Sequence, residues 1–175
     1  MLRIFLAAIF MFIIGLTKAQ DKIFWSENRK LVWEDFQSKN QPNTSKAAAT
    51  TFCGISYLLN SPTKKFSSKE VKIESFFVPS KSWAHSDHKT DLVLMHEQSH
   101  FDIAELFARR FRKSISDKIL DAKTLQKHYT NVYEAYKDFQ QDYETVTNHG
   151  RIREKQLEYS EKINQEIEKL SDFKI

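Results

Sequence analysis

The spacing of apolar residues after Thr90 is the feature that most restricts how this chain folds. From Thr90 almost to the last residue, apolar side chains recur at steps of three and four, as in amphipathic helices. Thr90 is a suitable N-cap for a first helix that ends near Ser114. The stripe of this helix expected to face the core consists of His96, His100, Ile103, Phe107 and Phe111.

Two further helices are predicted beyond the first. The second begins near Asp121 or Thr124 and ends at Gly150, and the third follows directly. The spacing of the tyrosines in the second helix explains them as core residues. Its apolar seam contains Leu125, Tyr129, Val132, Tyr136, Phe139, Tyr143 and Val146. The third helix offers Ile152, Leu157, Ile163, Ile167 and Leu170 for packing.

Two strands are predicted before the helices. Residues 50–58 are rich in β-forming residues, and residues 71–78 alternate at first between apolar and charged side chains. The polar stretch between them is expected to be a turn or loop, and Pro79 ends the second strand. The sequence therefore predicts an α+β fold, in which an N-terminal antiparallel strand pair or small sheet packs on three helices.

The first twenty residues have the layout of a secretory signal peptide. Arg3 is followed by an apolar run from Ile4 to Leu16 and then by small residues up to Ala19. The run is shorter than the roughly 20 residues that cross a bilayer, so no permanent membrane anchor is expected. We therefore predict residues 1–20 as the signal peptide and residues 21–175 as a single domain, in a secreted or periplasmic protein.

Charge and cysteine content argue against nucleic-acid binding and against catalysis by a cysteine. The formal charge of +4 falls by the two charges of Arg3 and Lys18 in the predicted mature chain, and so gives no sign of nucleic-acid binding. Cys53 is the sole cysteine, which excludes an internal disulfide. Its apolar surroundings favour a buried, inert thiol over a catalytic nucleophile.

The segment from His96 to His100 (HEQSH) contains the candidate metal ligands and the candidate catalytic residue. On a helix, residues four apart lie on one face, so both imidazoles can reach one metal ion. Zinc binds imidazole readily, and a catalytic site keeps a position open for water. Glu97 is the predicted general base for that water. A sheet followed by a metal-binding helix is the order found in zincin peptidases, so we expect a small zincin-like domain with one Zn²⁺ per chain.

The residues alone leave several candidates for a third ligand. His149 is the first choice, because it lies where the second helix ends, in a Thr-x-His-Gly turn. Glu144, on the second helix, is the alternative, as in gluzincins. Glu105 lies roughly 140° around the helix from the metal face, and an ion pair with Arg109 explains it more simply.

The chain also resembles a bacterial family of exported, uncharacterised proteins that are described, by inference, as zinc-dependent proteases. The resemblance rests on the run from His96 to Asp102, on Glu105, and on the pattern Tyr143-Glu144-x-x-Thr147-x-His149-Gly150. It implies the fold and the metal site, and it points to His149 as third ligand. Two positions depart from the pattern: Glu144 replaces an aspartate, and Val146 replaces an acidic residue. Weaker similarities occur at residues 31–36, 49–50 and 82–83.

The predicted function is therefore that of an exported zinc-dependent metallohydrolase, with a peptide or protein as its substrate. Two alternatives remain at the level of the sequence. One is a zinc hydrolase that acts on a cell-wall amide or another non-peptide substrate. The other is a non-catalytic helical binding module whose metal is structural or absent.

Overall fold

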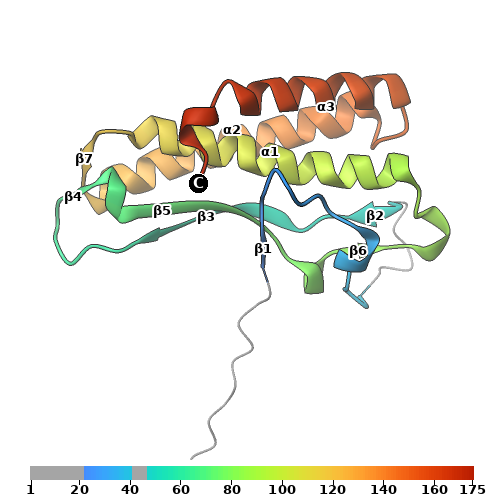
Figure 1. Cartoon of the computed structure of the whole chain (residues 1–175), viewed down its shortest axis with the longest axis horizontal. Coiled ribbons are helices and arrows are strands. Elements are labelled where there is room, and N and C mark those ends of the chain that lie inside the picture. Colours follow the sequence, from blue (N-terminus) through green and yellow to red (C-terminus); the bar gives the residue numbers. More distant parts are fainter. Residues whose placement is uncertain (1–21, 41–46) are drawn as a thin grey trace, which may run out of the picture.

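The computed structural model describes residues 22–40 and 47–175, and within them three long helices lie on one side of a small antiparallel sheet (Figure 1). The predicted signal peptide lies outside the described residues. None of the described helices is long and apolar enough to span a bilayer. The helices are α1 (Asp91–Ile115), α2 (Ala122–Thr147) and α3 (Arg153–Glu168). The strands are β1 (Ile23–Phe24), β2 (Ala49–Thr50), β3 (Cys53–Leu59), β4 (Phe66–Ser67), β5 (Val71–Phe77), β6 (Trp83–Ala84) and β7 (Ile119–Leu120).

The main sheet has three antiparallel strands in the order β1-β5-β3, with β3 at an edge. Two short strand pairs, β2-β6 and β4-β7, accompany it. The predicted strand pair is thus confirmed as β3 and β5. The stretch between them, expected to be only a turn or loop, also contains β4, because Phe66 is buried and pairs with Leu120 beyond α1.

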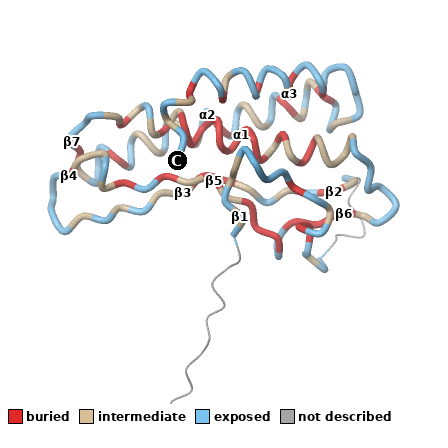
Figure 2. The backbone as a smooth tube through the Cα atoms, in the orientation of Figure 1, coloured by how far each residue is buried: buried red, intermediate tan, exposed pale blue. Residues whose placement is uncertain are grey.

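Helix α1 is the centre of the fold and packs against the sheet and against both other helices. It begins as predicted, with the Thr90 hydroxyl accepting a hydrogen bond from the Val93 amide at 3.3 Å. Buried positions run along most of its length, whereas α3 is largely exposed on its outer side (Figure 2). The inward stripe predicted for α1 is confirmed, since Ile103, Phe107 and Phe111 are at most 2% exposed.

Helix α2 starts at a cap formed by Asp121, whose carboxylate accepts a hydrogen bond from the Thr124 amide at 2.8 Å. It ends in a turn in which Asn148, His149 and Gly150 all have positive φ angles, so the chain reverses sharply before α3. This turn brings Gly150 against the side chain of His96 on α1.

The predicted packing face of α3 is only partly correct. Ile163, Ile167 and Leu170 are buried as expected, but Ile152 and Leu157 are 43% and 46% exposed. The inward position near the start of α3 belongs to a polar residue, Gln156, which is fully buried.

Candidate metal centre

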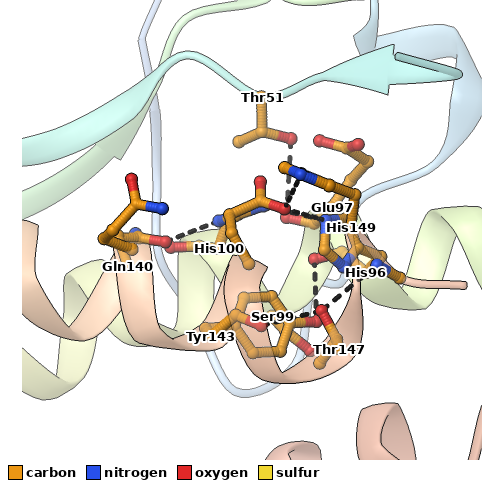
Figure 3. Close-up of polar contacts among 12 residues, drawn as sticks. Thr51, His96, Glu97, Ser99, His100, Gln140, Tyr143, Thr147 and His149 are labelled. Atoms are coloured by element: carbon orange, nitrogen blue, oxygen red, sulfur yellow. Dashed lines mark hydrogen bonds and ion pairs between the residues drawn. The ribbon is translucent and has the colours of Figure 1, made fainter. Parts of the chain in front are cut away.

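Helix α1 presents His96 and His100 one turn apart on its buried face, toward α2. Their Nε2 atoms lie 3.1 Å apart, and their rings are almost perpendicular. Figure 3 shows both imidazoles between Thr51 on the strand side and Tyr143 on the helix side. The predicted convergence of the two histidines is therefore present in the structure.

Glu144 on α2 supplies a carboxylate to the same point. Its Oε1 lies 3.0 Å from His100 Nε2, and its Oε2 lies 3.6 Å from His96 Nε2. One ligand atom from each of the three residues lies within 4.8 Å of the other two, so the group could hold a metal ion. We call His96, His100 and Glu144 the metal cluster.

The spacing and chemistry of the metal cluster fit zinc. Two atoms that each lie about 2.0–2.1 Å from a zinc ion are separated by about 3.3 Å in a tetrahedral site. The two Nε2 atoms are 3.1 Å apart, and the nearest Glu144 oxygen lies 3.0 Å from His100 Nε2 (Oε1) and 3.6 Å from His96 Nε2 (Oε2), so each nearest contact is close to that value. Two imidazole nitrogens and one carboxylate are also the protein ligands of a common class of catalytic zinc sites.

Two glutamines determine which nitrogen of each imidazole is available. His100 Nδ1 bonds to Gln140 Oε1, and Gln140 Nε2 donates to the His100 backbone carbonyl at 3.0 Å, which fixes the orientation of that amide. His96 Nδ1 lies 3.0 Å from Gln156 Oε1. Gln156 Nε2 donates in turn to the Tyr143 hydroxyl. Because an amide oxygen can only accept, Nδ1 is the protonated nitrogen of each neutral ring, which leaves Nε2 as the nitrogen that can bind a metal ion.

The charges in the site are strongly coupled. Burial by itself lowers the pKa of His100, but contact with Glu144 and the nearby charge of Glu97 outweigh it, and the pKa lies above its usual value. Burial raises the pKa of Glu144, but its bonds to His100 and His96 prevail and hold that pKa far below its usual range. Glu144 is therefore ionised at neutral pH, as a metal ligand must be.

Glu97 is buried beside the metal cluster with an unsatisfied oxygen. The residue is 4% exposed, and its Oε2 has no hydrogen-bond partner within the described residues. A buried carboxylate oxygen without a partner is costly, and it calls for a ligand, water or catalytic role. This observation fits the predicted general base, whose proton-accepting atom must remain free.

Tyr143 and Gly150 hold His96 from two sides. Tyr143 is fully buried, its ring stacks on His96 with centroids 5.0 Å apart, and burial raises the pKa of its hydroxyl. Its predicted role in the core is confirmed. At Gly150, φ is +73°, and a Cβ atom would lie 2.9 Å from the His96 ring, so only glycine fits. Thr147 supports the turn by accepting a bond from the Gly150 amide at 3.1 Å.

His149, the first choice for third ligand, lies next to the metal cluster but outside it. Its Nδ1 is 2.8 Å from Glu144 Oε2, and its side chain is 67% exposed. The αL turn after α2 directs the imidazole toward the outer oxygen of Glu144 instead of into the space between His96 and His100. Ligation by His149 stays a prediction, while the geometry favours the alternative, Glu144.

The remaining candidates have structural partners. Glu105 pairs with Arg109 at 2.9 Å, as predicted, on the part of α1 remote from the metal face. Cys53 is half-buried, its Sγ lies 3.4 Å from the His100 carbonyl oxygen, and burial raises its pKa to about 12. A thiol with that pKa is almost entirely protonated at neutral pH, which agrees with the inert role expected for Cys53.

A cleft of about 290 Å³ opens beside the metal cluster. One wall is the strand segment around Thr51, and the other is the face of α2 toward the cluster. It is lined by Thr51, Cys53, His100, Tyr136, Lys137, Gln140, Gln141 and Glu144. The site is therefore open to a ligand from outside at the point where His100 and Glu144 meet.

The chain was also compared with known proteins. No protein-family model, no curated protein and no solved structure matches it.

Two residues that matter in this site were missed in the sequence. Gln140 and Gln156 occupy positions that pattern analysis treats as ordinary polar positions on α2 and α3. Gln156 could have been found by its place in the helical repeat, since it shares a face with Tyr159 and Ile163, which are buried. Gln140 has the same signal, since it lies four residues after Tyr136 and three before Tyr143, which are both buried.

Proposed function

We propose that this protein is a zinc-dependent hydrolase of the zincin type, with His96, His100 and Glu144 as the metal ligands and Glu97 as the general base. The observation that carries the proposal is the pair of Nε2 atoms 3.1 Å apart beside an ionised carboxylate, with the unpartnered Glu97 oxygen next to them. Two lone pairs at that distance repel each other unless a proton or a metal ion lies between them.

When bound, the zinc ion would polarise the substrate carbonyl and lower the pKa of water at the site. Glu97 accepts the proton of the attacking water and then delivers it to the leaving amine. Gln140 and Gln156 keep the two imidazoles in the tautomer that ligates.

We propose a peptide as substrate because of the form of the cleft. One of its walls is the edge strand β3 and the residues before it, and an extended chain can align along such an edge. The predicted export of the protein agrees with a substrate outside the cytoplasm. The rival substrate, a cell-wall amide, requires the same ligands and the same base, so the choice between the two rests on assays of both.

The non-catalytic binding module is the second rival. A structural zinc site has four protein ligands. The metal cluster provides three among the described residues and opens on a cleft, which favours the hydrolase.

Replacement of Glu97 by Gln tests the proposal directly. Glu97→Gln should keep the zinc content of the wild type and lower hydrolysis by about 10²- to 10⁴-fold, since only proton transfer is removed. Glu154→Gln, an exposed change on α3, is the matched control and should leave the rate unchanged. The assay uses a mixture of quenched fluorescent peptides and, in parallel, cross-linked cell-wall fragments. Full activity of Glu97→Gln would refute the proposed base.

A further inference from the structure

The face of the sheet that points away from the helices has an unusual composition. All three helices lie on the opposite side (Figure 1). Along β5, Val71, Ile73 and Phe77 point inward to α1 and are buried, so the residues between them point outward. A solvated face of an antiparallel sheet is normally polar. This one is mixed, because large apolar side chains share it with Lys72, Glu74 and Ser56.

The outward residues form an aromatic face, which we define as Phe24, Phe52, Phe76 and Leu58. Phe24 is opposite Phe76 in the register of β1 and β5, so their side chains are neighbours. Phe24 and Phe52 are 46% and 44% exposed, and Leu58 is 64% exposed. No helix of the described chain packs over these side chains.

Three lysines border the aromatic face, and each has its ammonium group near one of the rings. Lys22 Nζ lies 4.0 Å from the centroid of Phe76, Lys81 Nζ lies 4.6 Å from that of Phe52, and Lys72 Nζ lies 5.8 Å from that of Phe24. Glu74 is the sole acidic residue among the outward positions of β5, and it pairs with Lys72. The rings and the ammonium groups beside them are therefore grouped toward the Phe76 end of β5, and the opposed residues Glu74 and Ser56 separate them from Leu58.

We propose that the aromatic face docks the protein onto the surface of an anionic lipid bilayer. Aromatic rings with adjacent lysines are the side chains that settle at the headgroup level of membranes, where the rings enter the interface and the ammonium groups meet lipid phosphates. The lysines thus favour an anionic partner. The exposed apolar side chains favour a partner with a hydrocarbon interior.

Docking through the aromatic face does not cover the metal cluster. The metal cluster lies on the helix side of the sheet, so docking leaves it accessible from water.

An anionic polysaccharide is the alternative partner that the charges alone would allow. Sugar rings bind proteins by stacking on the faces of aromatic rings. Lysine ammonium groups already lie over Phe76 and Phe52, with Nζ 4.0 and 4.6 Å from the ring centroids, so those covered faces are closed to sugar stacking. A bilayer interface makes no such demand on the ring faces, which favours lipid over a polysaccharide.

Vesicle co-sedimentation of the exported protein tests this inference. With vesicles of phosphatidylglycerol and phosphatidylcholine in equal parts, we expect binding at least about tenfold stronger than to phosphatidylcholine alone. The double variant Lys22→Glu/Lys81→Glu should lose at least about tenfold in binding to the anionic vesicles, and so should Phe24→Ser/Phe52→Ser. The matched control Lys155→Glu/Lys169→Glu makes the same charge change on exposed positions of α3 and should bind as the wild type does.

Several outcomes would overturn the proposal. An equal loss in the α3 control would show that net charge, not this face, controls binding. Equal binding to neutral vesicles would also overturn the proposal. So would tighter binding of a soluble anionic polysaccharide than of the anionic vesicles. Unchanged circular dichroism and Tm in every variant show that each one is folded, so a loss of vesicle binding is then a property of the face.

Discussion

At the scale of single residues, the metal cluster depends on hydrogen bonds from its two histidines to residues outside the cluster. Gln156 is fully buried, joins His96 to Tyr143, and thereby couples α3 to a ligand on α1. Gln140 does the same from α2, holding both the ring and the backbone carbonyl of His100. Because these amides fix the tautomers, their loss should weaken metal binding without removing a ligand.

Truncation of either glutamine tests this role. We expect Gln140→Ala and Gln156→Ala each to weaken zinc affinity by about 10- to 100-fold, as measured by competition with a chromophoric chelator. Gln165→Ala, on the exposed side of α3, is the control and should not change the affinity. Gln156→Glu should restore part of the loss, because a carboxylate still accepts from His96 Nδ1. Wild-type affinity in both alanine variants would contradict the assignment.

At the scale of elements, the half of α1 beyond the metal site is fixed by a buried ion-pair network. Glu105 bonds to Arg109 at 2.9 Å, to Arg112 at 3.0 Å and to the Ser75 hydroxyl at 2.6 Å. Arg109 also donates to the backbone carbonyl of Ile167 on α3 at 3.0 Å. The network thus joins α1 to β5 and to α3.

Removal of Arg109 should therefore destabilise the fold. Arg109→Met leaves Glu105 with fewer partners in a buried position, and we expect a loss of about 3–5 kcal/mol in the free energy of unfolding, measured in urea. Its neighbour provides the control: Arg110 is more exposed and pairs with Glu166 on the surface, so Arg110→Met should cost less than about 1 kcal/mol. Similar losses for the two variants would disprove the special role of the buried pair.

The helices show how far the sequence predicts elements and where it fails. The starts of α1 and α2 follow from caps at Thr90 and Asp121, because capping is local chemistry. The inward face of α3 follows only in part, because the repeat places Gln156 beside Tyr159 and Ile163, but the partner of its buried amide, His96, lies 60 positions earlier. Pattern analysis rates a glutamine as exposed and Leu157 as buried, and the tertiary contact reverses both.

The sequence likewise predicts part of the candidate site and fails for the rest. His96, Glu97 and His100 are recognisable, since their spacing on one helix places them together. The choice between Glu144 and His149 depends on the turn after α2. Its three consecutive positive φ angles set the direction of the His149 side chain, and no residue pattern specifies that direction.

At the scale of the whole molecule, the metal cluster joins elements that are distant in sequence. Its ligands come from α1 and α2, and Gln156 extends the connection to α3. Unfolding would separate them, so the unfolded chain should bind zinc weakly and the metal should stabilise the native state.

Thermal unfolding with and without metal measures this linkage. At a free zinc concentration 100 times Kd, the stabilisation is about 2.7 kcal/mol, which for a chain of this size raises Tm by about 5–10 °C. A chelator should reverse the increase, and Glu144→Gln should show little of it. An unchanged Tm at saturating zinc would mean that α1 and α2 do not share a metal ion.

The central claim is that His96, His100 and Glu144 bind one zinc ion, and metal content tests it most directly. Zinc per chain is measured by mass spectrometry on protein purified without added metal, for the wild type, Glu144→Gln and His149→Asn. We expect one zinc in the wild type, one in His149→Asn, and little or none in Glu144→Gln. Zinc retained in Glu144→Gln but lost in His149→Asn would make His149 the third ligand, and no zinc in the wild type after reconstitution would contradict the metal centre altogether.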